Sequence, residues 1–97
     1  MNPNDEVAVV AVIHPHPDRL DDAKAAVSAA LDAVRAEDGC LQYDPHLADD
    51  GTIIMVERWA SREALAAHSA GAPVTLLLER LEDLVTAPVG VTIAEAF

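Results

Sequence analysis

Val7-Ala8-Val9-Val10-Ala11-Val12-Ile13 is the stretch of the chain that decides its fold. Its residues are uninterruptedly apolar and rich in valine, which is typical of a β-strand. A strand in a sheet with one solvated face alternates apolar and polar residues, but here both alternating faces are apolar. The pattern therefore predicts a strand that is covered on both sides.

The rest of the chain divides into helices and strands around this first strand. The prolines of His14-Pro15-His16-Pro17 end the strand, and the acidic residues that follow favour a helix start. The sequence Asp49-Asp50-Gly51 is typical of a turn, and it separates two further strands. The expected helices cover residues 18–37, 61–69 and the stretch from 73 to before 88, and the expected strands cover 40–47, 52–59 and 89–93.

This order of elements predicts the α+β class, as a ferredoxin-like βαββαβ antiparallel sheet with the helices on one face. The helices leave the second face of the sheet uncovered. On the third predicted strand, Ile54 and Val56 alternate with Ile53 and Met55, so that strand is also apolar on both faces. A second copy of the chain is the expected cover, as a homodimer with sheets packed face to face.

Length and charge exclude several classes of protein. The 97 residues, 52% of them hydrophobic, suffice for one domain over 1–97, in which residues 1–6 are expected to be a flexible N-terminus. The net charge of −11 disfavours binding to nucleic acids or membrane surfaces. Cys40 is the only cysteine, which excludes an intramolecular disulfide and a cysteine-rich metal site. The acidic start does not resemble a signal peptide, so a cytoplasmic protein is expected.

Two segments carry recognisable motifs, Glu37-Asp38-Gly39-Cys40-Leu41-Gln42-Tyr43 and the stretch from Glu57-Arg58-Trp59 to Ala67-His68. The first resembles the E-x-G-C-x-x-Y junction that follows the first helix in the antibiotic biosynthesis monooxygenase (ABM) family. The second resembles that family's E-x-W signature and the following helix that ends in A-H. The resemblance spans nearly the whole chain and implies a ferredoxin-like protomer that dimerises through its sheet into a dimeric α/β barrel.

The resemblance also implies a chemistry, the oxidation of a small quinol or polycyclic phenolic substrate by O2. The family's oxygenases need no metal, haem or flavin, so no cofactor is expected. A deprotonated, electron-rich hydroxyarene can itself pass an electron to O2. The protein then supplies a proton acceptor, a dry pocket and polar groups for the developing charge. The haem-degrading branch is disfavoured because the first strand lacks its Asn and the third helix lacks its His.

Glu57 and His68 are the predicted catalytic residues. Alternation along the third strand places Glu57 on an apolar face, where a carboxylate needs a partner. His68 on the following helix, or Arg80 on the next, could be that partner. The functional interpretation is a Glu57–His68 pair in which the carboxylate orients an imidazole base. The alternative is a buried hydrogen bond that only docks the helix onto the sheet.

The predicted substrate-binding residues surround this pair. Trp59 and Tyr43 are the only tryptophan and tyrosine and could form walls for a planar molecule, although either could simply fill the core. Some anthrone oxygenases carry an Asn at the position of Met55, whose apolar side chain is an alternative core residue. No metal is expected, because the histidines 14, 16 and 46 complete no recognised ligand spacing. The full predicted set is Trp59, Tyr43, Met55, His14 and Arg80.

Two functions from different classes remain open. The first is a cofactor-independent monooxygenase that acts on a small aromatic substrate with O2. The second is a non-catalytic dimeric barrel that binds a small metabolite, or an isomerase that uses the same pocket. A pocket large enough for a bicyclic ring, with His68 in its wall, would favour the enzyme. A cleft filled by Leu77, Leu81 and Trp59 would favour the second class.

Overall fold

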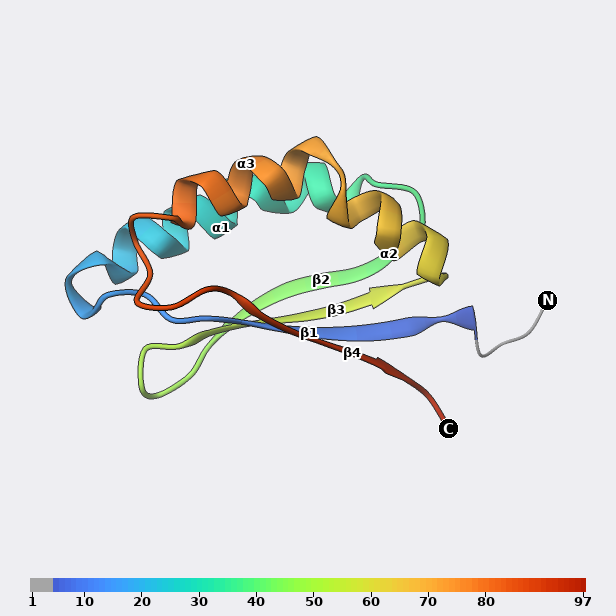
Figure 1. Cartoon of the computed structure of the whole chain (residues 1–97), viewed down its shortest axis with the longest axis horizontal. Coiled ribbons are helices and arrows are strands. Elements are labelled where there is room, and N and C mark those ends of the chain that lie inside the picture. Colours follow the sequence, from blue (N-terminus) through green and yellow to red (C-terminus); the bar gives the residue numbers. More distant parts are fainter. Residues whose placement is uncertain (1–4) are drawn as a thin grey trace.

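The computed structural model describes residues 5–97 as one antiparallel sheet with helices packed on one of its faces (Figure 1). The strand order is β2-β3-β1-β4, and every neighbouring pair of strands is antiparallel. A short 3-10 turn at Pro17–Arg19 precedes the first helix. The elements are β1 (Val7–Ile13), α1 (Leu20–Arg35), β2 (Cys40–Leu47), β3 (Ile53–Trp59), α2 (Arg62–Ser69), α3 (Ala72–Leu81) and β4 (Gly90–Glu95).

The predicted α+β, ferredoxin-like fold is confirmed. β1, the strand that is apolar on both faces, lies in the interior of the sheet between β3 and β4. α1 and α3 lie side by side over the sheet, and α2 lies near the C-terminal end of β3 (Figure 1). No helix within residues 5–97 combines the length and the apolar character that crossing a membrane requires.

The helix starts follow from local chemistry. Pro17 stands at the start of the 3-10 turn, and Asp21 and Asp22 place negative charge in the first turn of α1, where the helix dipole favours it. Ser61 caps α2, because its hydroxyl accepts a hydrogen bond from the backbone N–H of Ala64 at 3.1 Å. Ser61 thus fixes the start of α2, where the chain leaves β3.

α3 ends at Leu81, several residues earlier than the sequence predicts. The backbone N–H of His16 donates to the Leu84 carbonyl, and that of Thr86 donates to the His14 carbonyl, each at 2.8 Å. These bonds tie the chain after α3 to the segment that follows β1, so the helix cannot continue. Leu84 is still buried, although it lies beyond the helix.

The two faces of the sheet differ in exposure. The face under the helices holds the core residues of β1 and β3, which are almost completely buried. On the opposite face, Val10 at the centre of β1 is 41% exposed. Its partners across the ladder are Val56 of β3 and Thr92 of β4. The centre of this second face, along β1 and β3, is therefore apolar and uncovered in the protomer, as expected from the alternation of β1, whereas β2 places Gln42, Asp44 and His46 on the same face.

Ion pairs hold both ends of the described chain. Glu6 accepts a hydrogen bond from Arg58 of β3, and Glu95 at the end of β4 pairs with Arg62 of α2. Residues 1–4 of the N-terminus that was expected to be flexible lie outside the described residues. Glu6, the last residue of that predicted stretch, is anchored by its contact with β3.

Candidate functional site

An apolar pocket of about 270 Å³ lies between the covered face of the sheet and the helices α2 and α3. Its floor comes from β1, β2 and β3, and its roof comes from α2 and α3. A volume of this order accommodates a bicyclic aromatic ring but not a large cofactor. The lining residues are Val9, Ala11, Ile13, Tyr43, Met55, Glu57, Leu65, His68, Ser69, Val74, Leu77, Leu78, Leu81, Val89 and Val91.

Glu57 brings a carboxyl group to the floor of this pocket. It is only 5% exposed, on the covered face of β3. Its Oε1 accepts a hydrogen bond from the indole N–H of Trp59 at 3.0 Å. Burial raises the pKa of Glu57, and the Trp59 bond and the nearby His68 oppose that rise only in part. The group therefore keeps a proton to higher pH than an exposed glutamate does.

His68 enters the same pocket from the last turn of α2. Its Nδ1 lies 2.8 Å from Oε1 of Glu37, in the segment between α1 and β2. The imidazole ring stacks on Trp59 with 4.4 Å between ring centroids, and it meets Tyr43 edge-on at 5.7 Å. Packing on two aromatic rings and a bond to a carboxylate fix the position of the ring.

The predicted hydrogen bond between Glu57 and His68 is wrong, although both residues reach the pocket. Among the described residues, Glu57 is hydrogen-bonded to Trp59, and His68 is hydrogen-bonded to Glu37. Sequence reasoning missed Glu37 because it lies 31 positions from His68 along the chain. The signal was present in the E-x-G-C motif, whose first residue is Glu37.

The turn after α1 sets the position of Glu37. Gly39 has φ +79°, a left-handed conformation that side chains rarely adopt, and a Cβ there would lie 2.5 Å from the Cβ of Ala64. Its carbonyl accepts a hydrogen bond from Ala60 at 2.8 Å. The turn can therefore pack directly against the start of α2. Oε2 of Glu37 also lies beside Gly71, the N-cap of α3, where a helix dipole favours negative charge.

Tyr43 and Met55 line the pocket as the sequence predicted for substrate-binding residues. Both lie on the covered face of the sheet, Tyr43 on β2 opposite Glu57 of β3. Burial, followed by the neighbouring carboxylates, raises the pKa of Tyr43 above its ordinary value. Its hydroxyl therefore stays protonated at neutral pH and is available as a hydrogen-bond donor.

Three predicted site residues lie elsewhere. Trp59 is completely buried and does not line the pocket, because the His68 ring covers it. His14 is exposed and lies outside the pocket lining, since it follows β1 at the end of the strand. Arg80 is exposed on α3. It does not line the pocket, and it is not among the groups that shift the pKa of Glu57. Trp59 thus supports the two reactive side chains from behind instead of forming a wall.

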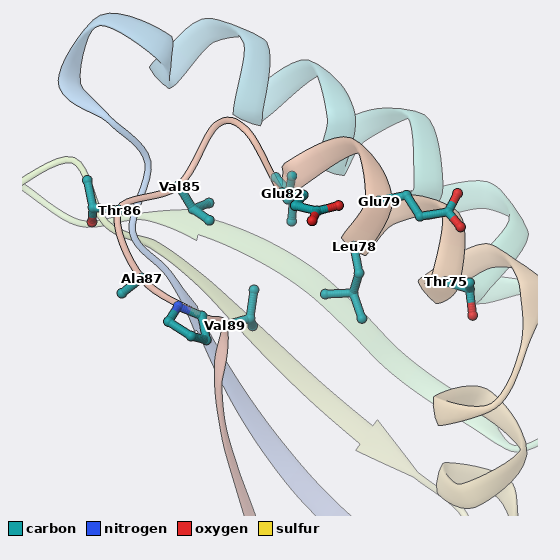
Figure 2. A pocket seen from close by; sticks show the side chains of 10 residues that line it. Thr75, Leu78, Glu79, Glu82, Val85, Thr86, Ala87 and Val89 are labelled. Carbon is teal, nitrogen blue, oxygen red and sulfur yellow. The ribbon is translucent and has the colours of Figure 1, made fainter.

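A second, more open cavity of about 610 Å³ adjoins the inner pocket (Figure 2). It lies between α3 and the segment that leads into β4, and Leu78 and Val89 extend into it from the two sides (Figure 2). Leu78, Leu81 and Val89 line both cavities. We call this outer cavity the vestibule, because it is the more open of the two and shares these three residues with the inner pocket.

Within residues 5–97, no group of three or more His, Cys, Asp or Glu side chains could hold one. The histidines 14 and 16 follow β1, and His46 lies on β2.

The fold and pocket together define a class of protein, a ferredoxin-like α+β protomer with a small apolar pocket between sheet and helices. The sequence model of the family described as "Antibiotic biosynthesis monooxygenase" matches residues 6–83. The chain belongs to this ABM family. A Mycobacterium tuberculosis protein named "Putative monooxygenase Rv0793" is 38% identical over 88 residues, covering 90% of this chain and 87% of the relative.

Solved structures show the same fold. The structure of Rv0793 from Mycobacterium tuberculosis superposes with a TM-score of 0.89 at 34% identity, covering 95% of each chain. A structure from Nitrosomonas europaea, titled "Putative antibiotic biosynthesis monooxygenase", has a TM-score of 0.90 at 16% identity, covering 99% of this chain and 94% of the other. At that identity the second likeness concerns the fold alone.

Proposed function

We propose that this chain is a cofactor-independent monooxygenase that oxidises a small quinol or polycyclic phenol with O2 in the inner pocket. The observation that carries the proposal is His68, an imidazole in the wall of an apolar pocket whose Nδ1 is already held by Glu37. Family membership and the name of the Mycobacterium tuberculosis relative agree with an oxygenase. The substrate class follows from the pocket and from the chemistry below.

The bond to Glu37 determines which nitrogen of His68 can act as the base. A carboxylate only accepts hydrogen bonds, so Nδ1 carries the proton that is donated to Glu37. The other nitrogen, Nε2, is then free to accept a proton from a hydroxyl group in the pocket. Glu37 thus takes the orienting role that the sequence assigned to Glu57.

The proposed reaction uses the reducing power of the substrate. Transfer of the hydroxyl proton to His68 leaves an electron-rich anion, which passes an electron to O2. The two radicals then combine at a substrate carbon. For an anthrone-type substrate, loss of water leaves a carbonyl, with one oxygen atom in the product and the other in the water. The four electrons that reduce O2 all come from the substrate, so the equation balances without a cofactor.

Other pocket residues support this chemistry. The hydroxyl of Tyr43 is a donor for the negative charge that develops on the substrate oxygen. Met55 and the leucines of α3 exclude water, which strengthens every polar interaction inside. Leu77 and Leu81 line the pocket without filling it, and Trp59 stays outside. This arrangement favours an enzyme over a barrel with a filled cleft.

We also propose that the protein acts as a homodimer through the uncovered face of the sheet. Val10 and Val56 are paired across β1 and β3 at the centre of that face. A contiguous apolar face is unfavourable in water, and packing two such faces together would bury both. The dimer would place the two inner pockets on opposite outer sides of the paired sheets, each under its own helices.

The function is tested by oxygen consumption with a panel of hydroquinones and anthrones in metal-free buffer. The wild-type protein is expected to consume O2 with at least one compound. His68→Asn keeps an amide donor for Glu37 but removes the base, so the rate should fall by about 10²–10⁴-fold, the usual contribution of a general base. Trp59→Phe keeps an aromatic ring under His68 and should cause a smaller loss.

Two results would contradict the proposal. A folded His68→Asn variant with the wild-type rate would remove His68 from the mechanism. A wild-type protein that consumes no O2 with any compound, yet binds several of them, would favour the metabolite-binding barrel or the isomerase instead. Circular dichroism on each variant separates loss of function from loss of fold.

A further inference from the structure

We infer that the inner pocket selects uncharged substrates and rejects molecules that carry a carboxylate, and that Glu57 is the residue that sets this selection. The inference rests on the proposed function in taking the inner pocket as the substrate site. It goes further by specifying the charge of the molecule that can enter.

The inner pocket contains a carboxyl group and no cationic side chain. Its ionisable lining residues are Glu57, Tyr43 and His68, and none of the six Lys and Arg residues lines it. The remaining lining is apolar except for Ser69. A carboxylate that entered would lose its water without gaining a counter-charge, and Glu57 would repel it at every pH at which the Glu57 carboxyl is ionised.

Most of the positive side chains are engaged on the surface. Arginines 19, 35, 58 and 62 each pair with a carboxylate, and each is substantially exposed. Lys24 lies on α1 and Arg80 on α3, both exposed and both outside the lining of the pocket. The chain thus directs its few cations away from the site.

His68 does not supply the missing positive charge. Its Nδ1 already faces the carboxylate of Glu37 at 2.8 Å. If His68 takes a proton from a substrate, the new positive charge is balanced by Glu37 on one side and by the substrate anion on the other. No charge is left over for a second anionic group on the same substrate.

The vestibule has the same sign of charge as the pocket floor. Glu79 and Glu82 of α3 line it, and no Lys or Arg does (Figure 2). An anion in the vestibule therefore lies beside two glutamates, next to the pocket that holds Glu57. With a net charge of −11 on the chain, repulsion of anions begins before entry and is completed inside.

The test compares three ligands that share one ring system, 2-naphthol, 6-hydroxy-2-naphthoic acid and the methyl ester of that acid. Binding is followed at neutral pH by the fluorescence of Trp59, the only tryptophan, which stacks on His68. The naphthol and the ester are expected to bind, and the acid is expected to bind at least about tenfold more weakly, as unfavourable charge interactions of this kind predict. The ester separates the effect of charge from the effect of size.

Variants assign the selection to Glu57. Glu57→Gln keeps an acceptor for the indole N–H of Trp59. It should reduce the preference for the ester over the acid by several-fold. Glu63→Gln removes one charge from an exposed position on α2 that lines neither cavity, and it should leave that preference unchanged. If both variants reduced the preference for the ester over the acid equally, the role of Glu57 would be overturned.

The remaining outcomes are also decisive. Equal affinity of wild type for acid and ester would overturn the charge selection, and failure of both naphthol and ester to bind would overturn the assignment of the pocket to neutral aromatics. Selective binding of the neutral ligands without any oxygen consumption would leave the charge selection standing and remove the proposed reaction. The binding and oxygen measurements therefore fail independently of each other.

Discussion

The two faces of the sheet are both apolar along the centres of β1 and β3, but β2 adds Gln42, Asp44 and His46 to the uncovered face alone. On the face under the helices, β1 and β3 contribute valine, isoleucine and methionine, and the same face also holds the buried carboxyl of Glu57. On the opposite face, Val10 and Val56 pair at the centre, with Arg58 further along β3. Apolar residues alone therefore do not distinguish a core from an interface.

The difference lies in what covers each face. The helices enclose the first face over β1 and β3 and leave a pocket of about 270 Å³, where polar groups are paired: Glu57 with Trp59 and His68 with Glu37. The second face has no cover within the described protomer. A buried polar group is tolerated only where partners satisfy it, which is the case for both of these side chains on the covered face.

The largest expected effect comes from the uncovered face. Val10→Glu should prevent dimerisation, weakening self-association by at least about 100-fold, because it places like charges together at the centre of the interface. Leu76→Glu is the matched control, since Leu76 is 46% exposed on α3, close to the 41% of Val10. Analytical ultracentrifugation at micromolar concentration measures both. A wild-type protein that remains a single chain would contradict the proposed dimer.

On the covered side, the packing of the α1–β2 turn should be the most sensitive point. Gly39→Ala forces a left-handed alanine against the Cβ of Ala64 and should reduce the free energy of unfolding by about 2–4 kcal/mol. Gly51→Ala also has a positive φ but nothing within 4 Å, so it should cost only about 1–2 kcal/mol. Urea unfolding measures both variants. Equal losses would show that the contact with α2 contributes nothing.

The smallest expected effect is the pH dependence that Glu57 adds to the covered face. Because burial raises the pKa of Glu57, the folded state holds its proton more strongly than the unfolded state does. The resulting stabilisation of the folded state is present below the ordinary carboxyl pKa of 4.5 and is lost as the pH rises through the raised pKa of Glu57. Compared with Glu57→Gln, the wild type should therefore lose melting temperature as pH increases. A difference that stays constant with pH would contradict this assignment.

Much of the fold could be predicted from short-range patterns. The uninterrupted apolar run of β1, the helical spacing of α1 and the turn at Gly51 are local signals, and they place β2 at Cys40–Leu47 as expected. The end of α3 could not be predicted in this way. The bonds that stop the helix come from His14 and His16, about 70 residues earlier, so no local pattern contains them.

The sequence predicted which reactive residues reach the pocket more accurately than it predicted their hydrogen-bond partners. Alternation along β3 and the A-H ending of α2 identified Glu57 and His68, and both reach the pocket. The choice of partners depends on tertiary packing, which brings Glu37 to His68 and keeps Arg80 on the surface. Trp59 was assigned to the correct face of the strand, but its depth depends on the His68 ring stacked over it.

The pair formed by Glu37 and His68 has a consequence for the fate of the proton in the proposed reaction. His68 faces the apolar pocket, whereas the Glu37 side chain is 20% exposed at the junction of α1 and β2. A proton accepted at one edge of the imidazole can be released from the other edge to Glu37 and from there to bulk water. The route bypasses the entrance, so turnover does not require water to follow the substrate inside.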